Sequence, residues 1–277
     1  MDLQFRVDTE LCIGCGQCVD DCPYMVLAMD ENVPMVVAAR AGACIRCQHC
    51  LAICPEAALS IHGVDPADCV SIQGHFPDVA RLDTLMRGRR SVRRYRDENV
   101  DLVLIRRLLD TAWQAPTGVN SRQVLFSVVD DKKSMAVLRQ EVMASLASAV
   151  REGKLPPERQ LFSGFVRLWE EKGVDIIFRG APHLLIASAP RNCPCPEPDC
   201  LIALSYFELL AQCYGLGTVW DGLARWTLSE FLPEFMERLG IPSDHLVGYA
   251  MVFGYPAVEY QRTVDHGPAS INRVVFG

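Results

Sequence analysis

One cysteine spacing occurs twice near the start of this 277-residue chain. Each copy reads C-x2-C-x2-C-x3-C-P, and the second copy begins 32 residues after the first. The eight cysteines are Cys12, Cys15, Cys18, Cys22, Cys44, Cys47, Cys50 and Cys54. Three thiolates at i, i+3 and i+6 can wrap three irons of a cubane, while the fourth points the other way and serves the other cluster.

This crossed arrangement predicts two [4Fe–4S] clusters. One is expected on Cys12, Cys15, Cys18 and Cys54, and the other on Cys44, Cys47, Cys50 and Cys22. Zinc sites instead use paired C-x2-C knuckles with a longer gap, so the spacing favours iron–sulfur clusters over zinc. Residues 1–62 resemble the bacterial-type ferredoxin domain, including short strands expected at 4–8 and 33–37.

Charge and hydropathy limit the location and the partners. The net charge of −7 lies in residues 1–70, which hold ten acidic residues and three arginines. An acidic head argues against nucleic acid and suits a basic redox partner, although it is also compatible with a plain solvated surface. No apolar run is long enough to span a membrane, and no secretion signal is visible, so we expect a cytoplasmic protein.

Beyond the cysteines, the pattern predicts a linker at 64–79 and a second domain at 80–277, after a ferredoxin-like domain at 1–63. Helices are expected at 78–89, 101–115, 132–151, 199–217 and 228–240, and strands at 124–131, 183–190 and 245–256. The alternation is too irregular for a doubly wound parallel sheet, so an α+β domain is predicted.

A basic segment at 87–96 (RGRRSVRRYR) places six arginines around Ser91. Guanidinium groups and a serine hydroxyl suit a phosphate, although a solvated basic face or a nucleic-acid patch is also compatible with the pattern. In order along the chain, this segment, an amphipathic helix, APTGVNSRQ (115–123) and GLGTVWDG (215–222) resemble the flavin-binding segments of the nitroreductase family.

The resemblance covers roughly residues 80–277 and implies an α+β domain that binds FMN at the interface of a homodimer. Carried over to this chain, the residues implied for FMN are Arg89, Arg90, Ser91, Arg93, Pro116, Thr117, Asn120, Gly217 and Thr218, with Arg262 or Arg273 as a further phosphate ligand. The continuation NSRQVLF departs from the usual Asn-x-Gln-Pro-Trp of the family. No side chain is predicted as catalytic, because the flavin carries the chemistry.

The expected function is therefore an FMN-dependent oxidoreductase. Two [4Fe–4S] clusters would pass electrons to FMN, which would reduce a nitroaromatic, a quinone or another activated unsaturated compound; reduced ferredoxin or NAD(P)H would be the donor. The alternative is an electron-transfer or redox-sensing module that serves a protein partner without small-molecule turnover. Reductive dehalogenation and flavin fragmentation are narrower alternatives.

A further group of cysteines follows no cubane spacing. Cys193, Cys195 and Cys200 lie in or next to the proline-rich stretch NCPCPEPDC, and Cys213 comes thirteen residues later. The pattern favours a stiff cysteine-bearing loop over a third metal site.

Overall fold

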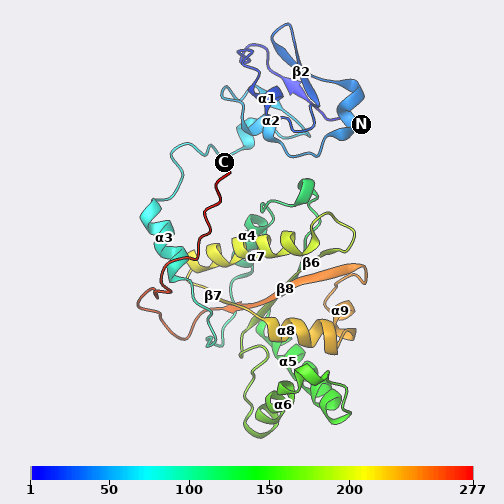
Figure 1. Cartoon of the computed structure of the whole chain (residues 1–277), viewed down its shortest axis with the longest axis vertical. Helices are drawn as coiled ribbons and strands as arrows, with labels where there is room; N and C mark the ends of the chain where they lie inside the picture. The colour runs from blue at the N-terminus through cyan, green and yellow to red at the C-terminus, as the bar shows by residue number, and fades with distance from the viewer. Residues whose placement is uncertain (1, 277) are drawn as a thin grey trace. The chain divides into compact units, whose positions relative to one another are not determined.

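The computed structural model describes residues 2–276 and divides them into two compact units (Figure 1). The first unit runs to Pro77 and also includes Val119–Ser121; the second comprises Asp78–Gly118 and the chain from Arg122 onward. The residues expected as a linker at 64–77 thus group with the first unit. None of the helices within residues 2–276 is both long and apolar enough to cross a bilayer.

The first unit is built from two similar halves. Its strands form two antiparallel pairs, β1 (Arg6–Val7) with β4 (Leu59–Ser60) and β2 (Leu27–Asp30) with β3 (Val33–Val36). One-turn helices α1 (Gln17–Asp20) and α2 (His49–Ala52) occupy equivalent places in the two cysteine motifs. Gly16 and Gln48 precede these helices with positive φ angles of 73° and 60°, which turn the chain sharply after the second cysteine of each motif.

A small apolar core holds this unit together. Its buried members are Leu3, Cys18, Val26, Leu27, Leu51, Leu59 and Ile61. Four further motif cysteines pack against this core, so the thiols lie beside it. A unit with so few buried side chains gains little stability from burial alone, and small domains of this size are commonly stabilised by metal.

The second unit contains a four-stranded antiparallel sheet in the order β5-β6-β8-β7. The strands are β5 (Leu125–Val129), β6 (His183–Pro190), β7 (Gly217–Trp220) and β8 (His245–Gly254). The two central strands, β6 and β8, are largely buried, and a register irregularity interrupts their pairing between Ala187 and Ser188.

Helices cover both faces of this sheet (Figure 1). On one face lie α4 (Leu102–Ala112) and α7 (Pro196–Cys213), which pack on inward residues such as Leu185 and Phe253. On the other face lie α5 (Lys132–Arg151), α6 (Leu161–Lys172) and α8 (Gly222–Trp226), which pack on Leu184 and Val252. The alternation of β6 between the two cores is the period-two pattern of a strand buried on both sides.

The helix starts follow from their capping residues. Asp101 accepts hydrogen bonds from the backbone of Val103 and Leu104, and Asp131 accepts one from Ser134. A carboxylate at this position satisfies amide groups that the first helical turn leaves free. These caps confirm the predicted starts of the helices at 101–115 and 132–151.

Two predicted helix boundaries were wrong. The helix expected at 199–217 begins at Pro196 and ends at Cys213, so Gly217 belongs to β7 instead. The helix expected at 228–240 is divided into a π-helical turn, Thr227–Phe231, and α9 (Glu234–Arg238). Pro233 lies at this break. It accounts for the interruption, because a proline disfavours helical geometry in the residue before it.

Candidate functional site

The eight motif cysteines line two separate cavities of the first unit. The first cysteine site is lined by Cys12, Cys15, Cys18 and Cys54, and the second by Cys22, Cys44, Cys47 and Cys50. Each site thus takes three cysteines from one motif and the fourth from the other. This is the crossed grouping that the spacing predicts for two cubanes.

The two crossing cysteines are held in the same way. The backbone amide of Val26 donates to Cys22 Sγ at 3.3 Å, and the amide of Ala58 donates to Cys54 Sγ at 3.3 Å. Each donor lies four residues after its acceptor, immediately before β2 or β4. N–H···S hydrogen bonds stabilise negative charge on sulfur, so both positions are prepared for a thiolate.

At the buried positions of these sites, a negatively charged thiolate is unfavourable unless a cation lies beside it. Burial, with smaller contributions from the neighbouring thiols of Cys47, Cys18 and Cys22, raises the pKa of Cys50 to about 12. Burial also raises the pKa of Cys18, with Cys54 and Cys15 adding to the effect. A metal cluster offsets this cost by supplying positive charge, so the donor set fits a cluster.

The other cysteines do not form a comparable site. Cys200 is fully buried against Gly248, while Cys213 is exposed at the far end of α7, about 20 Å along the helix. Within residues 2–276, no three His, Cys, Asp or Glu side chains converge as one metal ion requires. The ligands of a cubane are spread over several irons, so they need not converge on one point.

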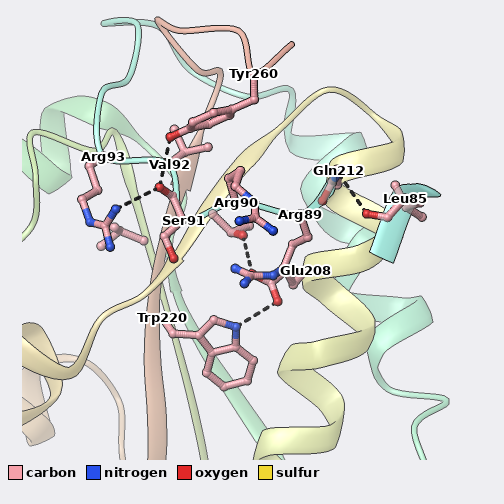
Figure 2. A network of polar contacts seen from close by, with 12 residues as sticks. Leu85, Arg89, Arg90, Ser91, Val92, Arg93, Glu208, Gln212, Trp220 and Tyr260 are labelled. Atoms are coloured by element: carbon pink, nitrogen blue, oxygen red, sulfur yellow. Dashed lines mark hydrogen bonds and ion pairs between the residues drawn. The ribbon is translucent and has the colours of Figure 1, made fainter. Parts of the chain in front are cut away.

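The basic segment follows α3 (Val79–Gly88) and reaches α7 through Glu208 (Figure 2). Glu208 is 6% exposed. Its Oε1 accepts a hydrogen bond from the Thr218 hydroxyl at 3.0 Å and lies 3.5 Å from Arg89 Nη1, and its Oε2 accepts one from Trp220 Nε1 at 2.9 Å. We call these four residues the Glu208 network. It fixes Arg89 through a buried carboxylate while leaving the guanidinium partly exposed.

Two further arginines of this segment, Arg90 and Arg93, lie near Ser91 (Figure 2). Arg90 donates to the Arg87 carbonyl at 2.9 Å, and its buried Nε has no hydrogen-bond partner within the described chain. The Ser91 carbonyl accepts from Arg93 at 3.4 Å and from the Tyr260 hydroxyl at 3.3 Å. Three guanidinium groups within five residues, one with an unused donor, fit an anionic ligand such as a phosphate.

The segment is attached to the sheet at β7. Ser91 pairs with Thr218 in a parallel bridge, and the Val92 amide donates to the Thr218 carbonyl at 2.9 Å. A Cβ on Gly217 would lie 2.5 Å from Val92 Cγ2, so this close approach requires glycine. The resemblance to the nitroreductase family implies that Gly217 and Thr218 lie beside a flavin ring. In the structure the Thr218 hydroxyl donates its hydrogen bond to Glu208.

The turn at 115–123 is held by Arg122, the residue at which the sequence departs from the family pattern. Its guanidinium donates to the carbonyls of Trp113 and Ala115, at 2.6 and 3.0 Å, and its amide donates to Thr117 Oγ1 at 3.1 Å. Buried Asp199 accepts from the Gly118 amide at 2.9 Å. Although Arg122 departs from the family pattern, its side chain stabilises the turn by donating hydrogen bonds to these backbone carbonyls.

Other implied flavin residues are not brought together in this chain. Pro116 is exposed, and Asn120, with a φ of 53°, belongs to the segment grouped with the first unit. Arg262 and Arg273 lie on the exposed stretch after β8, where no hydrogen bond or ion pair within residues 2–276 joins either to the basic segment. A groove of about 960 Å³ is lined by residues such as Arg225, Glu234 and His245, and by none of the implied flavin residues.

Sequence reasoning missed three residues that organise the site, namely Glu208, Asp199 and Arg122. Glu208 offered a signal, since it is the acidic residue in the otherwise uncharged stretch SYFELLAQC (205–213). A buried carboxylate on a core helix needs partners, so its presence there indicates a polar network.

Comparisons with other proteins agree with both parts of the site. Residues 86–255 match the Nitroreductase family, and residues 11–59 match the 4Fe-4S dicluster domain. A protein from Archaeoglobus fulgidus, named NADH dehydrogenase/NAD(P)H nitroreductase, is 25% identical over 192 residues, or 67% of this chain and 92% of that protein. A ferredoxin from Methanocaldococcus jannaschii is 38% identical over 68 residues, or 24% of this chain and 87% of the ferredoxin.

The fold of the second unit also resembles that of a solved nitroreductase. A nitroreductase from Bacteroides fragilis, solved with bound FMN, aligns with a TM-score of 0.55 at 20% identity, covering 69% of this chain and 98% of that one. The second unit is thus an α+β domain of nitroreductase type. The chain belongs to the nitroreductase family and carries a 4Fe-4S dicluster domain before the family domain.

Proposed function

We propose that this chain is an FMN-dependent oxidoreductase that receives electrons through two [4Fe–4S] clusters and reduces a small organic acceptor. The observation that carries the proposal is the pair of four-cysteine sites on the same chain as a nitroreductase domain. Clusters transfer single electrons, and FMN when bound supplies two-electron reduction of an organic compound. A fused ferredoxin domain therefore suits a one-electron supply to a two-electron reaction.

Each cofactor has identified residues in this proposal. Cys12, Cys15, Cys18 and Cys54 hold one cluster, and Cys44, Cys47, Cys50 and Cys22 hold the other. Arg89, Arg90 and Arg93 neutralise the FMN phosphate, with the Ser91 hydroxyl as a neutral donor. The role of Glu208 is to orient Arg89, since its carboxylate touches the guanidinium on the protein side.

We propose that a second copy of the chain completes the flavin site. Supporting this, α3 presents Val79, Leu82 and Met86 to solvent, and the chain end exposes Ile271, Val274, Val275 and Phe276. Apolar side chains gathered on a helix and on an extended segment are typical of surfaces that another chain covers. Arg262 or Arg273, both on the extended segment after β8, would then contact the FMN phosphate of either copy. Size-exclusion chromatography with light scattering tests the dimer.

The acceptor proposed is a nitroaromatic, a quinone or another activated unsaturated compound. The donor is reduced ferredoxin or NAD(P)H. The acidic first unit, with its net charge of −7 over residues 1–70, supports a basic protein donor that docks there.

The first test is cofactor analysis after anaerobic purification. The protein is expected to contain about eight irons and one FMN per chain, and to turn over an acceptor panel with reduced ferredoxin, NADH or NADPH. FMN that binds and is reduced without turnover of any acceptor would favour the protein-partner alternative. A flavin-free protein after FMN supplementation would refute the proposal.

A matched pair of variants tests the assignment of residues. Arg89→Ala removes the guanidinium held by Glu208 and should lower FMN retention without loss of iron. Arg87→Ala is the control, because Arg87 is an exposed arginine of the same segment that pairs with Asp83. Loss of iron with retained FMN in Arg89→Ala would contradict the division of roles.

A further inference from the structure

The two cysteine sites are built by an internal repeat, but they differ in charge. A shift of 32 residues superposes the motifs, and it relates α1 to α2. Beyond cysteines, the charged or titratable residue that lines the first site is Glu56, whereas His49 lines the second. The repeat therefore offers two sites of matched geometry and unequal electrostatics.

The largest difference is His62. Its Nε2 lies 3.7 Å from Cys44 Sγ in the second site. A cluster-bound thiolate can only accept a hydrogen bond, so the ring nitrogen is the donor in the loaded protein. The position 32 residues earlier is Asp30, which has no such donor.

The backbone fixes His62 in this place. Its amide donates to the Leu3 carbonyl at 2.8 Å, and its φ is 57°, within a turn closed by the Ile61–Val64 bridge. The ring is half-buried, so solvent screens its interaction with sulfur only in part.

Arg46 adds to the same asymmetry. It lies between Cys44 and Cys47, whereas the equivalent residue of the first motif is Gly14. Arg46 and Glu56 are both exposed, so water and salt weaken their effects on the clusters. The half-buried His62 contact should therefore outweigh them.

We infer that the second cysteine site has the higher reduction potential of the two, and that the His62 contact with Cys44 sets most of this difference. The inference rests on the proposed pair of clusters. Reduction adds one negative charge to a cluster, and a hydrogen bond to its sulfur stabilises that added charge. Glu56 acts in the opposite sense at the first site.

The consequence is an order of electron filling within the first unit. The first electron accepted resides on the cluster of the second site, and the next reduces the cluster of the first site. Transfer between them oxidises one cluster by one electron and reduces the other by one, with no bond formed or broken. His62 is thus a positioning and tuning residue, acting through Cys44.

The test is an anaerobic redox titration of the full-length protein, followed by electron paramagnetic resonance. Wild type should show two separate midpoints. His62→Leu should lower the higher midpoint and leave the lower one in place, so that the two converge; His62→Gln, which retains an N–H donor, should restore part of the separation. Glu56→Gln should raise the other midpoint by a smaller shift, and His75→Leu, an exposed histidine outside the motifs, should change neither.

The outcomes separate the inference from the proposed function. A wild-type protein reconstituted with iron and sulfide that binds no cluster refutes the proposed function. Full iron content in His62→Leu with both midpoints unchanged overturns the inference alone. Loss of iron from both His62 variants also overturns it, because His62 would then be needed for cluster assembly instead of tuning.

Discussion

The indole Nε1 of Trp220 donates a 2.9 Å hydrogen bond to Oε2 of Glu208, a carboxylate that is almost completely buried. The other oxygen of the same carboxylate faces Thr218 and Arg89. One side chain of α7 thereby joins β7 to the basic segment. The stability of the sheet edge and the position of Arg89, which we propose binds the FMN phosphate, depend on the same group.

Glu208→Ala should lower both stability and FMN retention. It leaves the Trp220 N–H and the Thr218 hydroxyl without their acceptor, at a cost of about 2–4 kcal/mol in the free energy of unfolding. Arg89 loses its orienting partner, so FMN should bind about tenfold more weakly. Urea denaturation and FMN fluorescence measure the two effects.

The control for this change is Glu197→Ala, which removes an exposed glutamate from the first turn of α7. It should alter the unfolding free energy by well under 1 kcal/mol and leave FMN binding unchanged. Equal behaviour of the two variants would show that the Glu208 network has no special role.

Gly217→Ala should destabilise the junction between β7 and the basic segment. The new Cβ would lie within 2.8 Å of three Val92 side-chain atoms, a clash that should cost about 1–3 kcal/mol and displace Ser91. Combining it with Val92→Ala should restore part of the stability lost, because the clashing methyl groups are gone. Additive costs in this double-mutant cycle would contradict the steric account.

Gly164→Ala provides the matched control. This glycine lies within α6 with nothing near its Cβ position, so alanine there should be neutral or stabilising by up to about 1 kcal/mol.

Much of this architecture follows from the sequence, because the determining signals are local. The strands at 183–190 and 245–256 are apolar runs, and the helix starts at 101 and 131 are set by aspartates that cap their own backbone. The cysteine spacing likewise groups the thiols as the two cavities do. Local geometry was sufficient for these features.

The features that were missed depend on contacts between distant residues. Glu208 meets Arg89 across 119 positions, and Asp199 meets Gly118 across 81. His62 follows no cysteine motif, yet it lies beside Cys44. Neither periodicity nor motif spacing contains such pairings, and the interruption of a helix at Pro233 was overlooked because the apolar pattern continued across it.

Asp221 predicts a pH dependence of stability. Burial raises its pKa to about 7, its Oδ1 accepts from the Ala224 amide at 2.9 Å, and its buried Oδ2 has no partner within the described chain. The unfolded carboxyl ionises near pH ~4. Between about pH 4 and pH 7 the folded state therefore binds more protons than the unfolded state. The free energy of unfolding falls as the pH rises through this range, by about 4 kcal/mol in all, and does not change further above about pH 7.

Asp221→Asn should abolish this slope and stabilise the protein at pH 8, since an amide oxygen can still cap Ala224. Urea denaturation between pH 4 and pH 8 measures it, with the exposed Asp244→Asn as control. An unchanged slope in Asp221→Asn would assign the pH dependence to another group.

The central claim is that the cysteine sites supply the flavin with electrons, and rapid-mixing spectroscopy of FMN reduction tests it most directly. Wild type and Cys47→Ser, which removes one ligand of the second site, would be compared with reduced ferredoxin as the one-electron donor. The account predicts FMN reduction at least about tenfold slower in Cys47→Ser at equal FMN content, because the path through the clusters is interrupted. Equally fast FMN reduction in a Cys47→Ser protein shown to lack the second cluster would contradict it.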